Sequence, residues 1–371
     1  MKPSRWARRF RRAAPPPAGV RADPAGLGPV RFIDDDADDG LVRLFGDLAA
    51  SATADPREGL KVLALSGGGA GGAFGAGALV GLTAAGTRPV FDVVTGVSTG
   101  ALIAPFAFLG SAWDDRLRDA YCGGQASDLL GLTGLRPGLS LFGGEALTSL
   151  IKRYVDESIL DAVRDAHRTG RRLFVATANL DTESTSIWDM GAIAGRGGPA
   201  ALSLFIDVLV ASESLPGLFP PRMIGVESGD LVFEEMHVDG GTISPLFVVP
   251  EPFLLSSARE WTASRIEIYA LVNTTLDARR LPMPMSGVPI LVRSFEMMLR
   301  SSYRTSLRSV AAFCEINGFV LRTASIPASA RMGSMLDFEA STMTAMFECG
   351  ERLAQTATLW STAATTLGGR A

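Results

Sequence analysis

The most constraining feature of the sequence is an alternation of short apolar runs with longer helical runs. Strand-like runs such as "LKVLALS" and "VFDVVTG" occupy residues 60–66, 90–96, 172–180 and 265–273, and helical runs occupy 71–86, 99–109 and 200–211. In such an order each strand is buried between helices on the two faces of one sheet. The pattern therefore predicts an α/β fold with a mostly parallel sheet.

The two ends of the chain differ from this pattern. Residues 1–22 carry seven basic side chains and no acid, and an acidic run of five aspartates follows within 34–39. Because this mixture buries little apolar surface, we expect a flexible arm over residues 1–58. Trp6 and Phe10 within it are more consistent with a solvated arm than with a membrane anchor.

The last 85 residues are predicted to be helical. Within them, residues 295–313 are amphipathic, and Arg300, Arg304 and Arg308 form one row that we expect on a solvated face. We therefore divide the chain into the arm, a core at 59–255, and a final strand with a helical C-terminal region at 256–371 that completes the same domain.

Composition excludes several classes of function. The net charge is -4 and the basic excess is confined to the arm, so no nucleic-acid partner is expected. Three widely spaced cysteines, Cys122, Cys314 and Cys349, predict reduced thiols rather than disulfides or a zinc site. No apolar run is long enough to span a bilayer, and no signal-peptide core follows the arginines. These features predict a protein that is cytoplasmic or peripheral to a membrane.

A glycine-rich loop, "SGGGAGG", joins the first strand-like run to the first helix. Gly67, Gly69 and Gly72 match G-x-G-x-x-G, which keeps a dinucleotide-binding oxidoreductase open as an alternative. That fingerprint needs an acid at the carboxyl end of the next strand, and Asp92 stands at the start of that strand instead. A phosphate-binding Walker loop needs a lysine that this loop lacks.

A second motif follows the next strand. Gly96, Ser98 and Gly100 form G-x-S-x-G between a strand and a helix, the context of a nucleophile elbow. The tight turn leaves no room for side chains at the two glycine positions, and it exposes the serine hydroxyl at a helix N-terminus.

The base for such a serine is sought among few residues. The chain has two histidines, His167 in a polar segment that we expect at the surface and His237 two residues before Asp239. A Ser-His hydrolase with His237 as base stays open. Asp239 begins an Asp-Gly-Gly turn and is either a turn former or the base itself.

Taken in order, the glycine loop, G-x-S-x-G and Asp-Gly-Gly resemble the patatin-like phospholipase family, and "ASESLPGLFPP" at 211–221 extends the resemblance over residues 61–250. The resemblance implies a three-layer α/β/α sandwich and a serine lipid acyl hydrolase without cofactor or metal. It implies Ser98 as nucleophile and Asp239 as proton acceptor. The implied oxyanion hole is Gly67, Gly68 and Gly69, and the other motif glycines are Gly72, Gly96, Gly100, Gly240 and Gly241.

The resemblance also implies a lipid or fatty-acyl ester as the substrate, with contact to a lipid surface. Apolar residues at 101–109 and 214–221 are candidates for an acyl-chain cleft. One position departs from the family pattern: Gly71 stands where many relatives have Arg or Lys. A catalytically silent protein with the same fold is a third alternative, which the intact motif residues disfavour.

Overall fold

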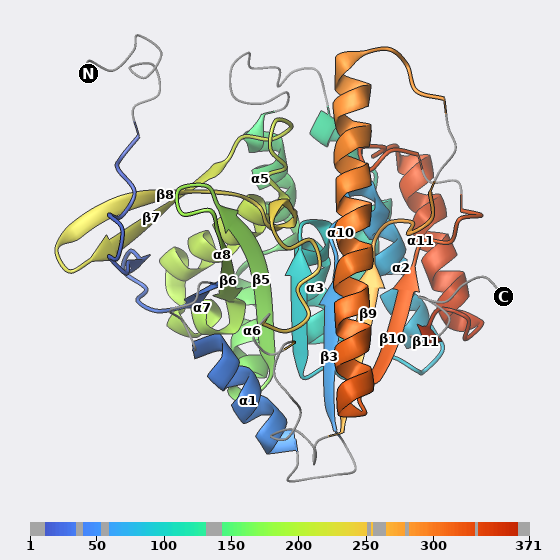
Figure 1. The fold of residues 1–371 in the computed structure, drawn as a ribbon, viewed down its shortest axis with the longest axis horizontal. Helices are drawn as coiled ribbons and strands as arrows, with labels where there is room; N and C mark the ends of the chain where they lie inside the picture. The colour runs from blue at the N-terminus through green and yellow to red at the C-terminus, as the bar shows by residue number, and fades with distance from the viewer. Residues whose placement is uncertain are drawn as a thin grey trace.

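The structure, a computed structural model, describes residues 12–34, 40–52, 59–130, 143–250, 254, 265–278, 282–330 and 333–362. At its centre, five neighbouring strands run parallel in the order β5, β4, β3, β9, β10. Their bounds are Arg172–Asn179 for β5, Val93–Val97 for β4, Leu60–Leu65 for β3, Ile266–Val272 for β9 and Val320–Ser325 for β10. Their carboxyl ends meet at one edge of the sheet, the upper edge in Figure 1, which we call the carboxyl edge.

Helices cover both faces of this sheet. Leu63 and Leu65 of β3 belong to one apolar core, while Val62 and Ala64 belong to another, as expected from the alternation of side chains along a strand. The first core is closed by α2 (Gly72–Ala84), α3 (Thr99–Leu109), α4 (Asp114–Cys122), α5 (Gly144–Tyr154), α6 (Glu157–Arg168), α7 (Met190–Arg196), α8 (Gly198–Glu213) and α11 (Ala340–Gln355). The second is closed by α1 (Gly40–Ala52) and α10 (Gly287–Asn317), which crosses in front of the strands in Figure 1. The predicted three-layer α/β/α fold is confirmed.

Antiparallel strands extend the sheet beyond β5 and β10. They are β1 (Asp23–Pro24), β2 (Arg31–Asp34), β6 (Ser184–Asp189), β7 (Arg222–Ser228), β8 (Leu231–Asp239) and β11 (Ser361–Thr362). The β7–β8 hairpin places the end of β8 beside β5, where Asp239 pairs with Thr177. Short 3-10 turns lie at Gly69–Gly71, Ser111–Trp113, Gln125–Leu130 and Gly240–Thr242.

The expected flexible arm over residues 1–58 is wrong for the residues described there, 12–34 and 40–52. β2 pairs with β6, and Phe45 of α1 stacks on Phe174 of β5 with ring centroids 5.9 Å apart. Arg31 is buried and forms an ion pair with Glu235 of β8. Apolar residues spaced by four in α1 form a stripe that the high charge of the segment obscured. Trp6 and Phe10 lie outside the described residues.

The C-terminal region also departs from expectation. It is not wholly helical, because β10 and β11 extend the sheet past β9. Nor do its arginines share a solvated face: the Arg300 Nε donates to the Thr275 carbonyl at 3.1 Å, and Arg304 donates to the Leu276 carbonyl. Arg308 is exposed. Guanidinium groups satisfied by carbonyls are compatible with burial, and charge patterning alone does not reveal this.

Helices α2 and α11 pack closely through glycines. A β carbon at Gly77 would lie 1.9 Å from the Phe347 carbonyl oxygen, and one at Gly350 would lie 2.1 Å from the Phe74 carbonyl oxygen. These two glycines therefore let the backbones of α2 and α11 come into direct contact.

We expect Gly77→Ala to destabilise the protein, because α2 and α11 must move apart to admit the methyl group. The cost should be about 1–3 kcal/mol, seen as a lower midpoint in thermal denaturation. Gly195→Ala in α7 is the matched control, since no described atom lies within 4 Å of its added β carbon. The control should be neutral or stabilising, and equal losses in both variants would contradict the packing argument.

Candidate active site

Ser98 lies in the turn between β4 and α3 at the carboxyl edge. Its φ of 53° and ψ of -134° are rare for a residue with a side chain. The Ser98 N–H donates to Ser212 Oγ at 3.0 Å, and Ser212 Oγ donates to the Ala176 carbonyl at 2.8 Å. These bonds fix the strained turn and leave the side chain at the N-terminus of α3, where the helix dipole stabilises negative charge.

The glycines of the elbow are required by close contacts. A β carbon at Gly96 would lie 2.5 Å from the Gly100 carbonyl oxygen, and one at Gly100 would lie 2.3 Å from the Leu65 carbonyl oxygen of β3. Added β carbons would also come within 3.0 Å of a neighbouring atom at Gly72, Gly240 and Gly241. The expected crowding at the elbow is therefore present, and it involves β3 as well as the turn itself.

Asp239, the last residue of β8, is 3% exposed. Its Oδ1 accepts a hydrogen bond from the Gly241 N–H at 2.7 Å. Burial raises the pKa of Asp239 to about 6, although hydrogen bonds from the Ser98 side chain and the Gly241 N–H lower it. The structure thus brings Ser98 and Asp239 together, and the carboxyl group is more basic than an exposed aspartate.

The glycine loop borders the Ser98 hydroxyl: a β carbon at Gly67 would lie 3.5 Å from Ser98 Oγ. The Gly67 N–H already donates to the Pro245 carbonyl at 3.3 Å, which argues against the expected use of this group toward a substrate. Gly68 and Gly69 have φ of 156° and 58°. Within the described residues, their N–H groups donate to no acceptor. Gly71 follows in a helical conformation.

Side chains from distant parts of the chain support this loop. The Asn273 side chain donates to the Ser66 carbonyl at 2.7 Å, and the Ala70 N–H donates to the Met335 carbonyl at 2.8 Å. The buried Tyr303 hydroxyl of α10 lies beside Gly67, 3.1 Å from where its β carbon would be. The sequence analysis did not identify these residues, because no local motif marks a contact made across the fold.

Neither histidine contacts Ser98. His237 is completely buried; its Nδ1 lies 3.0 Å from Thr177 Oγ1 and its Nε2 lies 3.1 Å from Glu235 Oε2. Both ring nitrogens are therefore engaged in a structural network, which contradicts the Ser-His alternative. His167, which we expected at the surface, is partly buried with its Nδ1 3.7 Å from Asp189 Oδ1.

We expect His237→Ala to lower stability and not to abolish chemistry. Loss of the ring removes one buried hydrogen-bond partner from Glu235, which keeps Arg31, and one from Thr177, which keeps Trp188, at a cost of about 1–3 kcal/mol. Ester hydrolysis by the folded protein should stay within about tenfold of the wild type, whereas removal of a general-base histidine costs about 10⁴-fold or more. Turnover below the melting temperature measures this, with His167→Ala as control; a loss of that larger size would restore the histidine mechanism.

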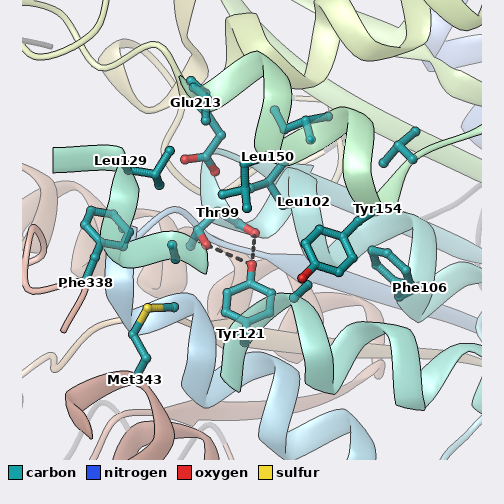
Figure 2. Close-up of a pocket in the computed structure, with 16 residues that line it drawn as sticks. Thr99, Leu102, Phe106, Tyr121, Leu129, Leu150, Tyr154, Glu213, Phe338 and Met343 are labelled. Atoms are coloured by element: carbon teal, nitrogen blue, oxygen red, sulfur yellow. Dashed lines mark hydrogen bonds between the residues drawn. The ribbon is translucent and has the colours of Figure 1, made fainter. Parts of the chain in front are cut away.

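An apolar cavity opens beside the elbow. Gly69 and Thr99 line its inner end, and side chains of α3, α4, α5 and the segment before α11 surround it (Figure 2). It is narrow, with a volume of about 60 Å³. Leu102 and Phe106 of the segment 101–109, which we expected to form an acyl-chain cleft, line this cavity, whereas no residue of 214–221 does.

Glu213, at the end of α8, points its carboxyl group into the same cavity (Figure 2). Its Oε1 is sealed from solvent and has no hydrogen-bond partner within the described residues. Burial, reinforced by the negative charge of Asp239, raises the pKa of Glu213 well above its ordinary value. These effects favour the neutral acid, which suits an otherwise apolar cavity.

The residues needed for a dinucleotide or metal site are not assembled here. Asp92 Oδ2 accepts the Lys61 N–H at 2.8 Å, at the edge of the sheet opposite the glycine loop, so it cannot hold a ribose beside that loop. Within the described ranges, no group of three His, Cys, Asp or Glu side chains is placed to bind a metal ion.

The fold and site define a class: a three-layer α/β protein with a serine elbow beside a glycine-rich loop. The sequence model of the patatin-like phospholipase family matches residues 63–250, just over half of the chain. The chain belongs to this family.

Two solved structures are similar in fold. VipD from Legionella pneumophila is 12% identical with a TM-score of 0.42, and the match covers 82% of this chain and 68% of VipD. Human GIVD cytosolic phospholipase A2 is 12% identical with a TM-score of 0.40, covering 84% of this chain and 61% of the human protein. No curated protein matches the sequence. None of the helices in the described ranges is long and apolar enough to cross a membrane.

Proposed function

We propose that the protein is a serine lipid acyl hydrolase that acts on a phospholipid or related fatty-acyl ester through a Ser98–Asp239 dyad. The proposal depends above all on one observation, the proximity of the Ser98 side chain to Asp239, a buried carboxyl group whose pKa is raised to about 6. Family membership supports the lipid ester as substrate.

In the first half of the reaction, Asp239 accepts the hydroxyl proton while Ser98 Oγ attacks the ester carbonyl carbon. The carbonyl oxygen becomes an oxyanion, and the N–H groups of Gly68 and Gly69 are available to stabilise it, with the α3 dipole acting in the same sense. Collapse of the intermediate breaks the ester C–O bond. Asp239 returns its proton to the departing alcohol, and the acyl group stays on Ser98.

In the second half, a water molecule gives its proton to Asp239 and attacks the acyl-enzyme. The bond between the acyl carbon and Ser98 Oγ breaks, the proton passes from Asp239 back to Ser98 Oγ, and a fatty acid leaves. The apolar cavity beside Gly69 and Thr99 is suited to the acyl chain, although its narrow volume requires the lining side chains to move apart. One sheet joins residues 59–255 to the C-terminal strands, which supports a single catalytic domain across both.

The experiment that tests the proposal combines labelling and turnover. A fluorophosphonate should label the wild-type protein once, at Ser98, and peptide mapping locates the modified residue. The same preparation should release fatty acid from phospholipid vesicles, and prior labelling should abolish the release. Labelling elsewhere, or release that survives complete labelling of Ser98, would falsify the mechanism.

A further inference from the structure

An exposed apolar surface covers the N-terminal half of α10. Ile290, Leu291, Met297 and Met298 are 50%, 62%, 60% and 68% exposed. The pairs are separated by seven residues, two helical turns, so the four side chains share one face, which we call the α10 apolar surface. Met285, just before the helix, is fully exposed as well. Large side chains grouped in this way mark a binding surface, whereas single exposed ones do not.

The apolar character stops part of the way along the helix. Over the following turns of α10 the exposed positions at Ser301, Thr305, Arg308 and Ser309 are polar, and Ile316 is exposed near the C-terminal end of the helix. The N-terminal turns of α10, which carry the apolar residues, lie toward the carboxyl edge of the sheet (Figure 1). The surface is thus confined to the end of the molecule that holds Ser98.

Contacts connect this half of α10 to the site. Glu296 Oε1 accepts the Met335 N–H at 2.9 Å, and the Met335 carbonyl in turn accepts the Ala70 N–H of the glycine loop at 2.8 Å. On the adjacent turn, Leu299 Cδ2 would lie 3.7 Å from a β carbon at Gly241. The α10 apolar surface therefore adjoins the loop and the Asp239 turn.

The charge of the segment is complementary to an anionic surface. Between Asp277 and Glu315 the chain has six arginines and one acid, Glu296, in a protein with a net charge of -4. Arg300 and Arg304 donate to neutral carbonyls and so keep their positive charge, and Arg308 is exposed. Glu296 is turned toward Ser334 and Met335 and pairs with Arg293. A basic segment that exposes long apolar side chains has the composition of helices that bind at anionic lipid interfaces.

We propose that the α10 apolar surface docks the protein on an anionic phospholipid surface, with Ile290, Leu291, Met297 and Met298 inserted among the acyl chains. This inference rests on the proposed function only for what happens next, the transfer of a lipid from that surface to Ser98. A second copy of the chain is the weaker occupant, because basic residues would face each other and stable protein interfaces use about 20–30 residues a side.

The test measures co-sedimentation of the full chain with vesicles of phosphatidylcholine and phosphatidylserine, with pure phosphatidylcholine as reference. The test variant changes all four surface residues to serine. The matched control changes Val90, Leu231, Val232 and Ile316 to serine. These are exposed to a similar extent, at 62–71%, and lie outside the α10 apolar surface, with Ile316 at the opposite end of α10. We expect the test variant to lose at least about tenfold in partitioning to the anionic vesicles, and the control to stay within about twofold of the wild type.

Hydrolysis of a soluble short-chain p-nitrophenyl ester separates this inference from the proposed function. The test variant should keep wild-type turnover of that ester and lose turnover of vesicle lipid. Equal partitioning of test variant and wild type overturns the docking surface even if both hydrolyse the soluble ester. If light scattering shows that the wild type is a dimer and the test variant is not, while both bind vesicles equally, the α10 apolar surface is a self-association surface and the docking proposal is overturned. Absence of ester hydrolysis in every variant, with vesicle binding as expected, removes the proposed function and leaves the docking surface.

Discussion

Replacing Ser98 with alanine should reduce ester hydrolysis by at least about 10³-fold and leave the protein folded. The substitution removes the hydroxyl that forms the acyl-enzyme, and loss of a nucleophile has an effect of this size or larger in other serine hydrolases. The Ser98 N–H still donates to Ser212 Oγ, so the turn keeps its anchor. Initial rates with a chromogenic ester, together with thermal denaturation, measure both effects.

Ser214→Ala is the matched control for this variant. Ser214 is also buried, its hydroxyl donates to the Val210 carbonyl within α8, and its carbonyl accepts the Asp239 N–H. Because the backbone contact survives the substitution, activity should fall no more than a few-fold. Retention of activity in Ser98→Ala, or an equal collapse in Ser214→Ala, would show that Ser98 is not the nucleophile.

Asp239→Asn should cost about 10²–10⁴-fold in kcat, the range that general-base catalysis contributes. The amide keeps the size of the side chain and an oxygen for the Gly241 N–H, but it cannot take the Ser98 proton. Asp189→Asn is the control, because Asp189 is likewise a buried carboxyl group that caps a helix, with Oδ1 accepting the Ala192 N–H at 2.8 Å. Single-turnover measurements on both variants separate chemistry from product release.

The pH dependence of kcat/KM gives an independent test of Asp239. The ionised carboxylate is the reactive form, so kcat/KM should fall about tenfold per pH unit below about 6 and level off above it.

The free energy of unfolding should change with pH in the opposite direction. Because the folded-state pKa is raised, the contribution of Asp239 to stability is present at low pH and is lost as the pH rises toward about 6. Asp239→Asn should therefore melt no lower than the wild type at neutral pH, and a profile without an inflection near 6 would contradict this role.

Much of the fold was predictable because its strong signals are local. The strands at 60–66 and 172–180 and the helix at 99–109 have runs of apolar residues bounded by glycine or polar turns, and the structure has an element at each. The elbow at Ser98 was predictable for the same reason, since its glycine spacing follows from the crowding of the turn. Asp239 was identified only through the order of the motifs, because an Asp-Gly-Gly sequence by itself is equally typical of an ordinary turn.

The features that escaped prediction depend on long-range contacts. Nothing near Ser212 shows that its hydroxyl would receive the Ser98 N–H, and Glu213 is marked only by the cavity around it. In the sequence, the Gly67 N–H is equivalent to those of Gly68 and Gly69 as an oxyanion donor. The structure shows that it donates to the Pro245 carbonyl instead. His237 illustrates the reverse error: it lies two residues from Asp239 in the sequence, but its ring is held by Thr177 of β5 and by Glu235 of its own strand.

The support of the glycine loop has a consequence for the order in which the protein is made. A ribosome completes Ser98 and Asp239 well before it adds Asn273, Met335 and α11, on which the loop and α2 depend. A nascent chain that already contains every motif residue therefore still lacks the contacts that shape the loop. The proposed esterase activity should therefore begin only once the C-terminal helices have emerged.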